Sequence, residues 1–244
     1  MNGLIWHEVE CGSYTADLPL WEELADSLDE EEPIMELGCG AGRVTLHLAE
    51  KTGLLVIGLD NDRKLIEAIW ERGHATTADA EQEDVRAFEP MATKFSLVIA
   101  PMQLIQLLSD SQERVACLSC TSDSMLPGAR AAFAIVETMP ELPPPGTSAA
   151  PLPDVREIEG WIYSSLPLEP VALPEAILLR RLRQTVDPDG DMSEELNEIE
   201  LAMLSAETLE EEGRAAGLQP SGRREIPSTE AHVGSTVVLF EKVS

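Results

Sequence analysis

Basic residues are scarce in this chain of 244 residues, in which 17 Lys and Arg stand against 45 Asp and Glu and the net charge is −28 at pH 7. Proteins that bind nucleic acids neutralise phosphates with Lys and Arg, and the short basic clusters 180–183 and 223–224 form no basic stripe. The same charge repels anionic lipid surfaces and favours a neutral or cationic small molecule, although an acidic surface that only maintains solubility explains it equally well. We therefore expect no nucleic acid and no membrane as a partner.

Long apolar runs and a disulfide framework are also lacking. No stretch reaches the roughly 18 apolar residues that a membrane span requires. Residues 1–8 lack the basic and apolar regions of a signal peptide, and the chain has four cysteines. Cys117 and Cys120 have the spacing of a redox or zinc pair, but no second Cys/His pair accompanies them, so we interpret them as packing residues of a helix. We expect a cytoplasmic protein with reduced thiols and no metal site.

Segment 34–44 is the most informative part of the chain, because it predicts a buried strand, a glycine-rich turn and the first turn of a helix. Glycines let a ligand approach the backbone, and a helix N-terminus offers free N–H groups to a nucleotide-like ligand. The dinucleotide fingerprint G-x-G-x-x-G requires glycine where this chain has Arg43. Glu36, two residues before Gly38, is an acid that the dinucleotide pattern lacks. The spacing therefore disfavours an NAD-dependent enzyme.

A second apolar run, 54–59, predicts a strand buried on both faces and ends in Asp60. An acid at this place can accept hydrogen bonds from both ribose hydroxyls of a nucleotide. A strand-end acid that only caps the following helix, 62–72, is the alternative. Because several nucleotide cofactors use such an acid, Asp60 alone does not identify the ligand.

The pattern E-x-G-x-G-x-G that starts at Glu36 resembles motif I of the class I S-adenosylmethionine-dependent methyltransferases. Segment 84–88 resembles the D-x-R-x-F pattern of this family, and segment 95–101 is similar to its fourth strand, with Ser96 where aspartate is usual. Segment 126–128 is similar to the turn that precedes strand five. The resemblance covers residues 34–137, with weaker similarity near both ends of the chain.

The resemblance implies an α/β protein with a Rossmann-like class I methyltransferase fold: a mostly parallel seven-stranded sheet with helices on both faces, and a small antiparallel insertion after strand five. We expect four regions. They are an N-terminal helical cap at 1–33 with a helix over 14–28, a cofactor-binding core at 34–138, a Pro-rich loop and insertion at 139–204, and a last helix and strands at 205–244 that complete the core.

The insertion is where we expect the substrate to be selected. Residues 139–153 contain six prolines and predict a stiff loop. Three strand-like segments follow, 155–165, 176–186 and 197–204, and the turn signal 187–191 joins the last two. We expect an antiparallel roof over the strand ends that closes the substrate site or forms a homodimer contact; a cover for apolar core is the alternative. Trp161 and Tyr163 share one face of it, either for a planar substrate or for its own core.

The cofactor implied by the resemblance is S-adenosylmethionine. We prefer Asp84 over Asp79 as the acid that faces adenine, with Val85 packed on the ring, and we place Ala100 and Met102 beside the sulfonium. The predicted cofactor-binding residues are Glu36, Gly38, Cys39, Gly40, Arg43, Asp60, Asn61, Asp84, Val85, Ala100 and Met102.

The predicted reaction transfers a methyl group to an O, N or C atom of a small-molecule acceptor, plausibly in specialised metabolism. Placement of the acceptor and exclusion of water supply most of the catalysis, and one base helps to remove a proton. Of the four histidines, His7 and His232 fall near the usual substrate entrance, and His232 is preferred, with Glu137 and Tyr14 as further candidates. The alternative is a protein that binds the cofactor for a cyclisation or for a regulatory role.

Overall fold

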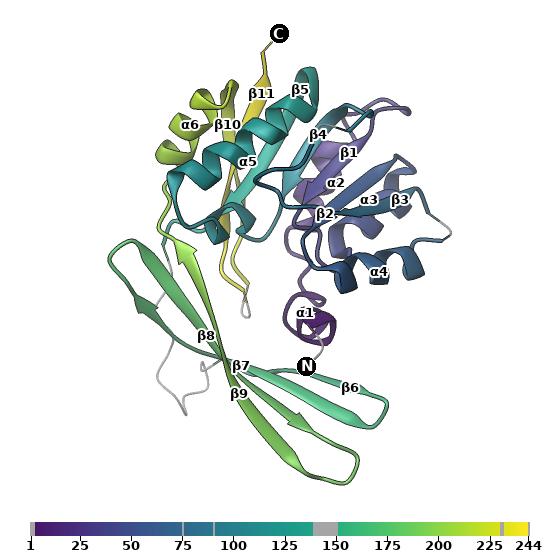
Figure 1. The fold of residues 1–244 in the computed structure, drawn as a ribbon, viewed down its shortest axis with the longest axis vertical. Helices are drawn as coiled ribbons and strands as arrows, with labels where there is room; N and C mark the ends of the chain where they lie inside the picture. The colour runs from purple at the N-terminus through teal and green to yellow at the C-terminus, as the bar shows by residue number, and fades with distance from the viewer. Residues whose placement is uncertain (1–2, 75, 90, 139–150, 230–231, 244) are drawn as a thin grey trace.

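The computed structural model describes residues 3–74, 76–89, 91–138, 151–229 and 232–243. They form a seven-stranded sheet flanked by helices and a separate four-stranded sheet, with the short helix α1 (Gly3–Cys11) between the two (Figure 1). The predicted fold class is confirmed. None of the helices in these residues has the length and apolar character to cross a bilayer.

The large sheet has the strand order β10-β11-β5-β4-β1-β2-β3, and β11 runs antiparallel to both of its neighbours, β10 and β5. Parallel pairing of β1 with β2 and β4 brings the carboxyl ends of these strands to one edge, where nucleotides bind in open α/β sheets. The strands are β1 (Ile34–Leu37), β2 (Val56–Asp60), β3 (Ala78–Gln82), β4 (Phe95–Ala100), β5 (Met125–Ile135), β10 (Leu218–Ile226) and β11 (Ser235–Lys242).

Helices cover both faces of this sheet because the inner strands are apolar on both sides. On one face, Trp21 and Leu48 pack with Ile34 of β1. On the other face, Leu118 and Leu209 belong to the same cluster as Met35, the next residue of β1. The first face carries α2 (Leu18–Ala25), α3 (Arg43–Thr52) and α4 (Arg63–Arg72), and the second carries α5 (Ser111–Ser124) and α6 (Ala206–Ala215). The 3₁₀ helix η1 (Leu104–Leu107) follows β4.

Strand β3 is the edge strand of the sheet, where its polar side chains face solvent. Two predicted elements differ from the structure. The helix predicted over 14–28 is only Leu18–Ala25, because residues 12–17 form turns between it and α1. Strand β5 begins at Met125 and includes the segment 126–128 that was predicted as the turn before it, and its pairing with β4 is irregular there.

The insertion is an antiparallel sheet of four strands in sequence order, one more than predicted. The segment 155–165, expected as one strand, folds back as a hairpin because Glu159 and Gly160 take positive φ angles of 52° and 81°. The turn at 187–191 is confirmed. The strands are β6 (Asp154–Ile158), β7 (Trp161–Ala172), β8 (Ala176–Val186) and β9 (Met192–Ala202). Residues 139–150 of the predicted Pro-rich loop lie outside the described residues.

The insertion is held at the carboxyl edge of the large sheet on two sides. The buried amide of Gln106 in η1 accepts the N–H of Val136 at 2.7 Å and donates to the carbonyls of Val136 and Ala202 at 3.0 and 2.9 Å. These two residues lie where the chain leaves and re-enters the core. On the other side, Tyr163 of β7 packs edge-on against Trp6 of α1 at 5.5 Å between ring centroids, so Tyr163 belongs to the packing of the insertion.

Candidate cofactor and acceptor site

The glycine-rich turn after β1 has the conformation that its sequence predicts. Gly38, Gly40 and Gly42 have φ angles of 64°, 55° and 85°, in the left-handed region that residues with a Cβ avoid. Gly42 is the N-cap residue of α3, so the free N–H groups of this helix begin directly at the turn. The turn lies at the edge where β1 and β2 end, and the side chains of Leu104, His7 and Ile69 lie over Gly38, Gly40 and Gly42.

Asp60, the last residue of β2, joins this turn to the neighbouring strand. One carboxylate oxygen accepts the N–H of Gly40 at 2.9 Å and the other accepts the N–H of Asp62 at 2.9 Å. The cap of α4 is Asp62, whose side chain accepts the N–H of Lys64, so capping is not the role of Asp60. A carboxylate has about four acceptor positions, and the two that remain are free for ribose hydroxyls. Asn61 follows and uses its carbonyl to accept from the Gln82 amide.

Glu36 lies under the turn, fully buried on the α3 side of β1, and accepts a hydrogen bond from the Thr45 hydroxyl. Burial raises the pKa of Glu36 to about 8, and the hydrogen bond from Thr45 offsets only part of this effect. Glu36 is therefore mostly a neutral carboxyl at neutral pH. This geometry makes it a support of the glycine turn, and its predicted contact with the cofactor stays a prediction.

Arg43 and Cys39, both predicted to contact the cofactor, have protein partners in the structure. The Arg43 guanidinium makes a two-pronged bond to Asp17 at 2.7 Å for each oxygen and donates to the Tyr14 carbonyl at 2.8 Å. Burial alone lowers the pKa of Arg43, but the bond to Asp17 outweighs it and the pKa is raised. Cys39 packs against Gly58 of β2, and burial raises the pKa of its thiol. Both side chains hold the turn in place.

Asp84 and Val85 follow β3 at the same edge, whereas Asp79 lies within the strand. This position agrees with the preference for Asp84, although its carboxylate is paired with Arg86 at 2.7 Å. The hydrogen bond from Arg86 lowers the pKa of Asp84, so the group is ionised. At the other end of the series, Ala100 is the last residue of β4, and Met102 follows in a left-handed conformation with φ 50°. The contacts of Asp84 and Val85 with adenine, and of Ala100 and Met102 with the sulfonium, stay predictions.

Of the three predicted catalytic residues, the structure brings two together. The rings of Tyr14 and His232, far apart in sequence, lie with centroids 4.6 Å apart at an angle of 34°. Burial raises the pKa of Tyr14 to about 12 and lowers the pKa of His232, so both are neutral at pH 7. Glu137 instead accepts the N–H of Ala206 at the start of α6, at 2.8 Å.

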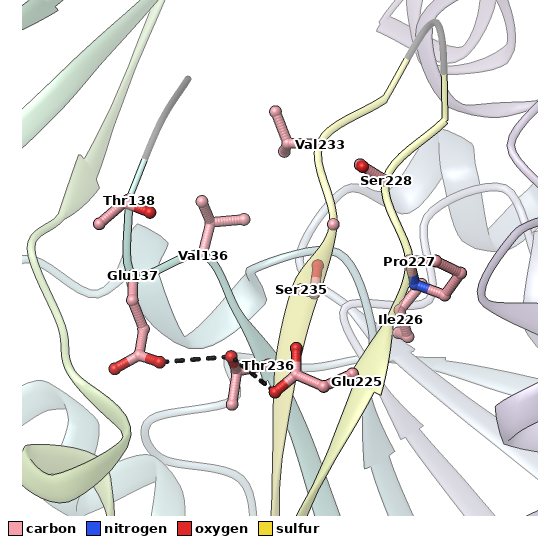
Figure 2. Close-up of a pocket in the computed structure, with 11 residues that line it drawn as sticks. Val136, Glu137, Thr138, Glu225, Ile226, Pro227, Ser228, Val233, Ser235 and Thr236 are labelled. Carbon is pink, nitrogen blue, oxygen red and sulfur yellow. Dashed lines mark hydrogen bonds between the residues drawn. The ribbon is translucent and has the colours of Figure 1, made fainter.

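Glu137 lies in a neighbouring open pocket of about 490 Å³ at the ends of β5, β10 and β11 (Figure 2). The Thr236 hydroxyl stands between Glu137 and Glu225, 3.3 and 3.4 Å from their carboxylates. Val136, Ile226 and Pro227 form its apolar part. A hydroxyl has one proton, so Thr236 can donate to only one of the two carboxylates at a time.

The sequence placed His7 near the substrate entrance but did not connect it with the glycine turn. Helix α1 was not predicted as such, although Ile5, Trp6 and Val9 have the spacing of a buried helix face. This helix sets the imidazole of His7 directly on Gly40, where a Cβ added to the glycine would lie 2.0 Å from Nε2. His7 is therefore the side chain that covers Gly40 of the turn.

Comparison with known proteins agrees with this architecture. Residues 34–128 match the family model described as a methyltransferase domain. A comparison with curated protein sequences gives no significant match.

Solved structures with the same fold include the sugar N-methyltransferase KedS8 from Streptoalloteichus sp., with 15% identity over 99% of this chain and 92% of that chain and a TM-score of 0.76. The amino pentose methyltransferase CalS10 from Micromonospora echinaspora has 15% identity over 100% and 98% and a TM-score of 0.72. Streptomyces venezuelae DesVI has 18% identity over 96% and 94% and a TM-score of 0.71. At this identity the likeness shows the fold. Residues 34–128 thus match a methyltransferase domain, and the chain has the fold of S-adenosylmethionine-dependent methyltransferases, in agreement with the resemblance found at motif I.

Proposed function

We propose that this protein transfers the methyl group of S-adenosylmethionine to the nitrogen atom of a small-molecule amine. The observation that carries the proposal is the glycine turn at the end of β1, held to Asp60 at the end of β2 by the Gly40 N–H. The glycine backbone of the turn, the unpaired N–H groups at the start of α3 and the free acceptor positions of the Asp60 carboxylate form a site that suits the cofactor. The choice of nitrogen follows KedS8, a sugar N-methyltransferase, and the glycopeptide N-methyltransferase MtfA, both of which share the fold.

Each strand end at this edge of the sheet is assigned one part of the cofactor, in the order of the strands. We assign adenine to Asp84 and Val85 after β3, ribose to Asp60 after β2, the methionine part to the turn after β1, and the sulfonium to Ala100 and Met102 after β4. S-adenosylmethionine supplies an activated methyl group. The protein holds the acceptor in line with that group and keeps water away, which are the main sources of rate in such a reaction.

The acceptor side is formed by Tyr14 and His232. A neutral amine attacks with its lone pair, so its nitrogen must be unprotonated before the new N–C bond forms. The neutral imidazole of His232 accepts the proton that this nitrogen loses, and the neutral Tyr14 ring stacks on the imidazole and limits its orientations. The excess of acidic residues, including those of the neighbouring pocket, draws a cationic amine to this edge.

Titration calorimetry with S-adenosylmethionine and S-adenosylhomocysteine tests the cofactor, and release of S-adenosylhomocysteine in the presence of small amines or alcohols tests the reaction. We expect micromolar binding of both compounds and turnover with amines. Absence of binding would overturn the proposal. Binding without turnover on any amine would move the protein to the non-methyltransferase role that the sequence left open. The homodimer, the absence of nucleic-acid partners and the cytoplasmic location stay predictions.

The Asp60→Ala variant should bind S-adenosylhomocysteine about 30-fold more weakly, a loss of about 2 kcal/mol from the removed charge-assisted hydrogen bonds. Asp60→Asn keeps an acceptor oxygen for the Gly40 N–H and should lose less, which separates the ribose contact from support of the turn. Asp62→Ala removes the cap of α4 at the neighbouring position and is the matched control. Calorimetry that gives equal dissociation constants for wild type and Asp60→Ala would contradict the ribose role.

The His232→Gln variant should lower kcat about 10-fold and leave the affinity for S-adenosylhomocysteine unchanged. The effect is modest because an amine can also lose its proton to water after the methyl group has moved. Burial lowers the pKa of His232, so the base form persists below the ordinary histidine pKa of about 6.5, and the acidic limb of the kcat profile should lie there. His47→Gln, on the surface of α3, is the control. A pH profile of kcat that is the same in wild type and His232→Gln would reject this role.

A further inference from the structure

His7 occupies a place that the proposed reaction does not yet explain. The three atoms nearest to a Cβ at Gly40 all belong to its imidazole, at 2.0, 2.4 and 3.0 Å. Any ligand that binds at the backbone of Gly40 must therefore contact the imidazole of His7. No hydrogen bond of the ring to another side chain or backbone group is found within the part of the chain that the structure describes, so its donor and acceptor are available to a ligand.

The place of Gly40 along the sheet edge identifies the part of the cofactor concerned. Strand β1 lies between β2, whose Asp60 is assigned to the ribose, and β4, which leads to the methyl group. The sulfonium of S-adenosylmethionine carries the ribose, the methyl group and the methionine chain, which ends in an ammonium group and a carboxylate. With the ribose assigned to β2 and the methyl group to β4, the methionine chain is the part left for the turn after β1. The ring of His7 thus stands where these charged groups have to be bound.

The basic side chains near His7 are already paired with other side chains of the protein, so none of them is free to bind the carboxylate of the methionine moiety. The charged groups that act on His7 are Asp60, Arg43, Glu10 and Arg72. Arg43 is already bonded to Asp17, and Arg72 is paired with Glu8. Glu10 is bonded to Arg183 at 2.7 Å through each oxygen. Within this set, the histidine is the donor that is not engaged.

Helix α1 is held firmly enough to aim this ring. Trp6 packs against Tyr163 of β7, and Arg183 of β8 lies over the Trp6 ring at 5.1 Å. Glu8 bridges Arg72 of α4 and Arg156 of β6, so the helix is tied to the core on one side and to the insertion on the other (Figure 1). The orientation of α1 therefore depends on both sheets.

We propose that His7 binds the carboxylate of the methionine moiety of S-adenosylmethionine, so that α1 and the insertion complete the cofactor site. The inference rests on the proposed function, because it requires that this cofactor binds at the glycine turn. Burial lowers the pKa of free His7, with the opposing attraction of Asp60 smaller. A bound carboxylate favours the imidazolium, and affinity should therefore rise as the pH falls from about 8 to about 6.

The test compares two ligands that differ only in the amino-acid part: S-adenosylhomocysteine, which has the carboxylate, and methylthioadenosine, which lacks it. Calorimetry is carried out on wild type, His7→Ala, His7→Gln and, as a matched histidine control, His47→Gln. We expect His7→Ala to bind S-adenosylhomocysteine about 10-fold more weakly and methylthioadenosine as well as wild type does. His7→Gln should recover part of the loss and lose the rise in affinity at low pH. Circular dichroism melts show whether each variant is folded.

The outcomes separate the two proposals. If wild type binds neither ligand, the proposed function fails. If wild type binds and His7→Ala binds S-adenosylhomocysteine equally or more tightly, the ring only obstructs the turn, and the inference is overturned. Equal weakening of both ligands would also overturn it, because the effect would then lie in the adenosine part or in the fold.

Discussion

Replacing Arg114 with methionine is expected to lower the free energy of unfolding by about 3–5 kcal/mol. Arg114 of α5 donates to the two carboxylate oxygens of Glu212 in α6 at 2.9 and 2.8 Å, and to the Leu108 carbonyl at 3.1 Å. Both side chains are buried, with 8% and 7% exposed. The variant leaves Glu212 as a buried carboxylate without its partner, which costs far more than the pair itself contributes.

Urea unfolding followed by circular dichroism measures this loss. The double variant Arg114→Met, Glu212→Leu should recover most of the stability, because it removes both charges from the interface of α5 and α6. Arg223→Met is the matched control, since Arg223 pairs with Glu207 and Glu210 on the surface and should show no measurable change. A loss in the double variant as large as in Arg114→Met would show that packing, and not the unpaired charge, sets the effect.

The sequence predicted the glycine turn and the position of Asp60, because the backbone conformation of each depends mainly on the residues of one short segment. Gly38, Gly40 and Gly42 take positive φ angles, a conformation that favours glycine, and all four residues of the strand before them are buried. Asp60 ends the next apolar run, and parallel pairing of the two strands places it beside Gly40. Local conformation and a single rule of strand pairing were sufficient here.

The missed features depend on contacts between distant segments. The polar sequence of β3 is explained by its place at the edge of the sheet, which follows from the strand order and not from the segment itself. His7 covers Gly40 only because α1 packs between α4 and the insertion. The rings of Tyr14 and His232 are in contact although the two residues lie near opposite ends of the sequence. No periodicity in a single sequence reports such contacts.

The roles of Arg43 and Glu36 illustrate a second limit. Their position in motif I predicts contact with the cofactor, which stays a prediction, and the structure adds that Arg43 is bonded to Asp17 and Glu36 to Thr45. A motif records which residues a turn requires, and it does not separate those that touch a ligand from those that hold the turn. For Glu36 the distinction has a measurable consequence for stability.

The Glu36→Gln variant is expected to unfold with a free energy about 3 kcal/mol higher than wild type at pH 7, and with the same free energy near pH 4. Glutamine has the shape of the neutral carboxyl and keeps an oxygen for the Thr45 hydroxyl. It has no ionised form, so it removes the cost of holding an acid neutral in the folded protein when that acid ionises in the unfolded chain.

The sign follows from the two pKa values of Glu36. Its pKa is about 8 in the folded protein, raised by burial, against the ordinary value of 4.5. Below pH 4.5 the group is protonated in both states and makes no difference to stability. As the pH rises from 4.5 toward 8, the unfolded chain loses its proton and the folded protein keeps it, so stability falls across this window and levels off above it.

Urea midpoints measured at half-unit steps of pH for wild type and Glu36→Gln show the difference directly, because the other titrating groups are common to both proteins. Glu50→Gln, an exposed acid of α3, is the control and should follow wild type at every pH. Parallel curves for wild type and Glu36→Gln would mean that Glu36 is ionised in the folded protein and stabilised there by the Thr45 hydroxyl and the nearby Arg43. In that case a negative charge would lie directly beneath the glycine turn and oppose the carboxylate of the methionine moiety. A difference that opens between pH 4.5 and 8 instead shows a neutral support, which leaves the turn free to bind that carboxylate.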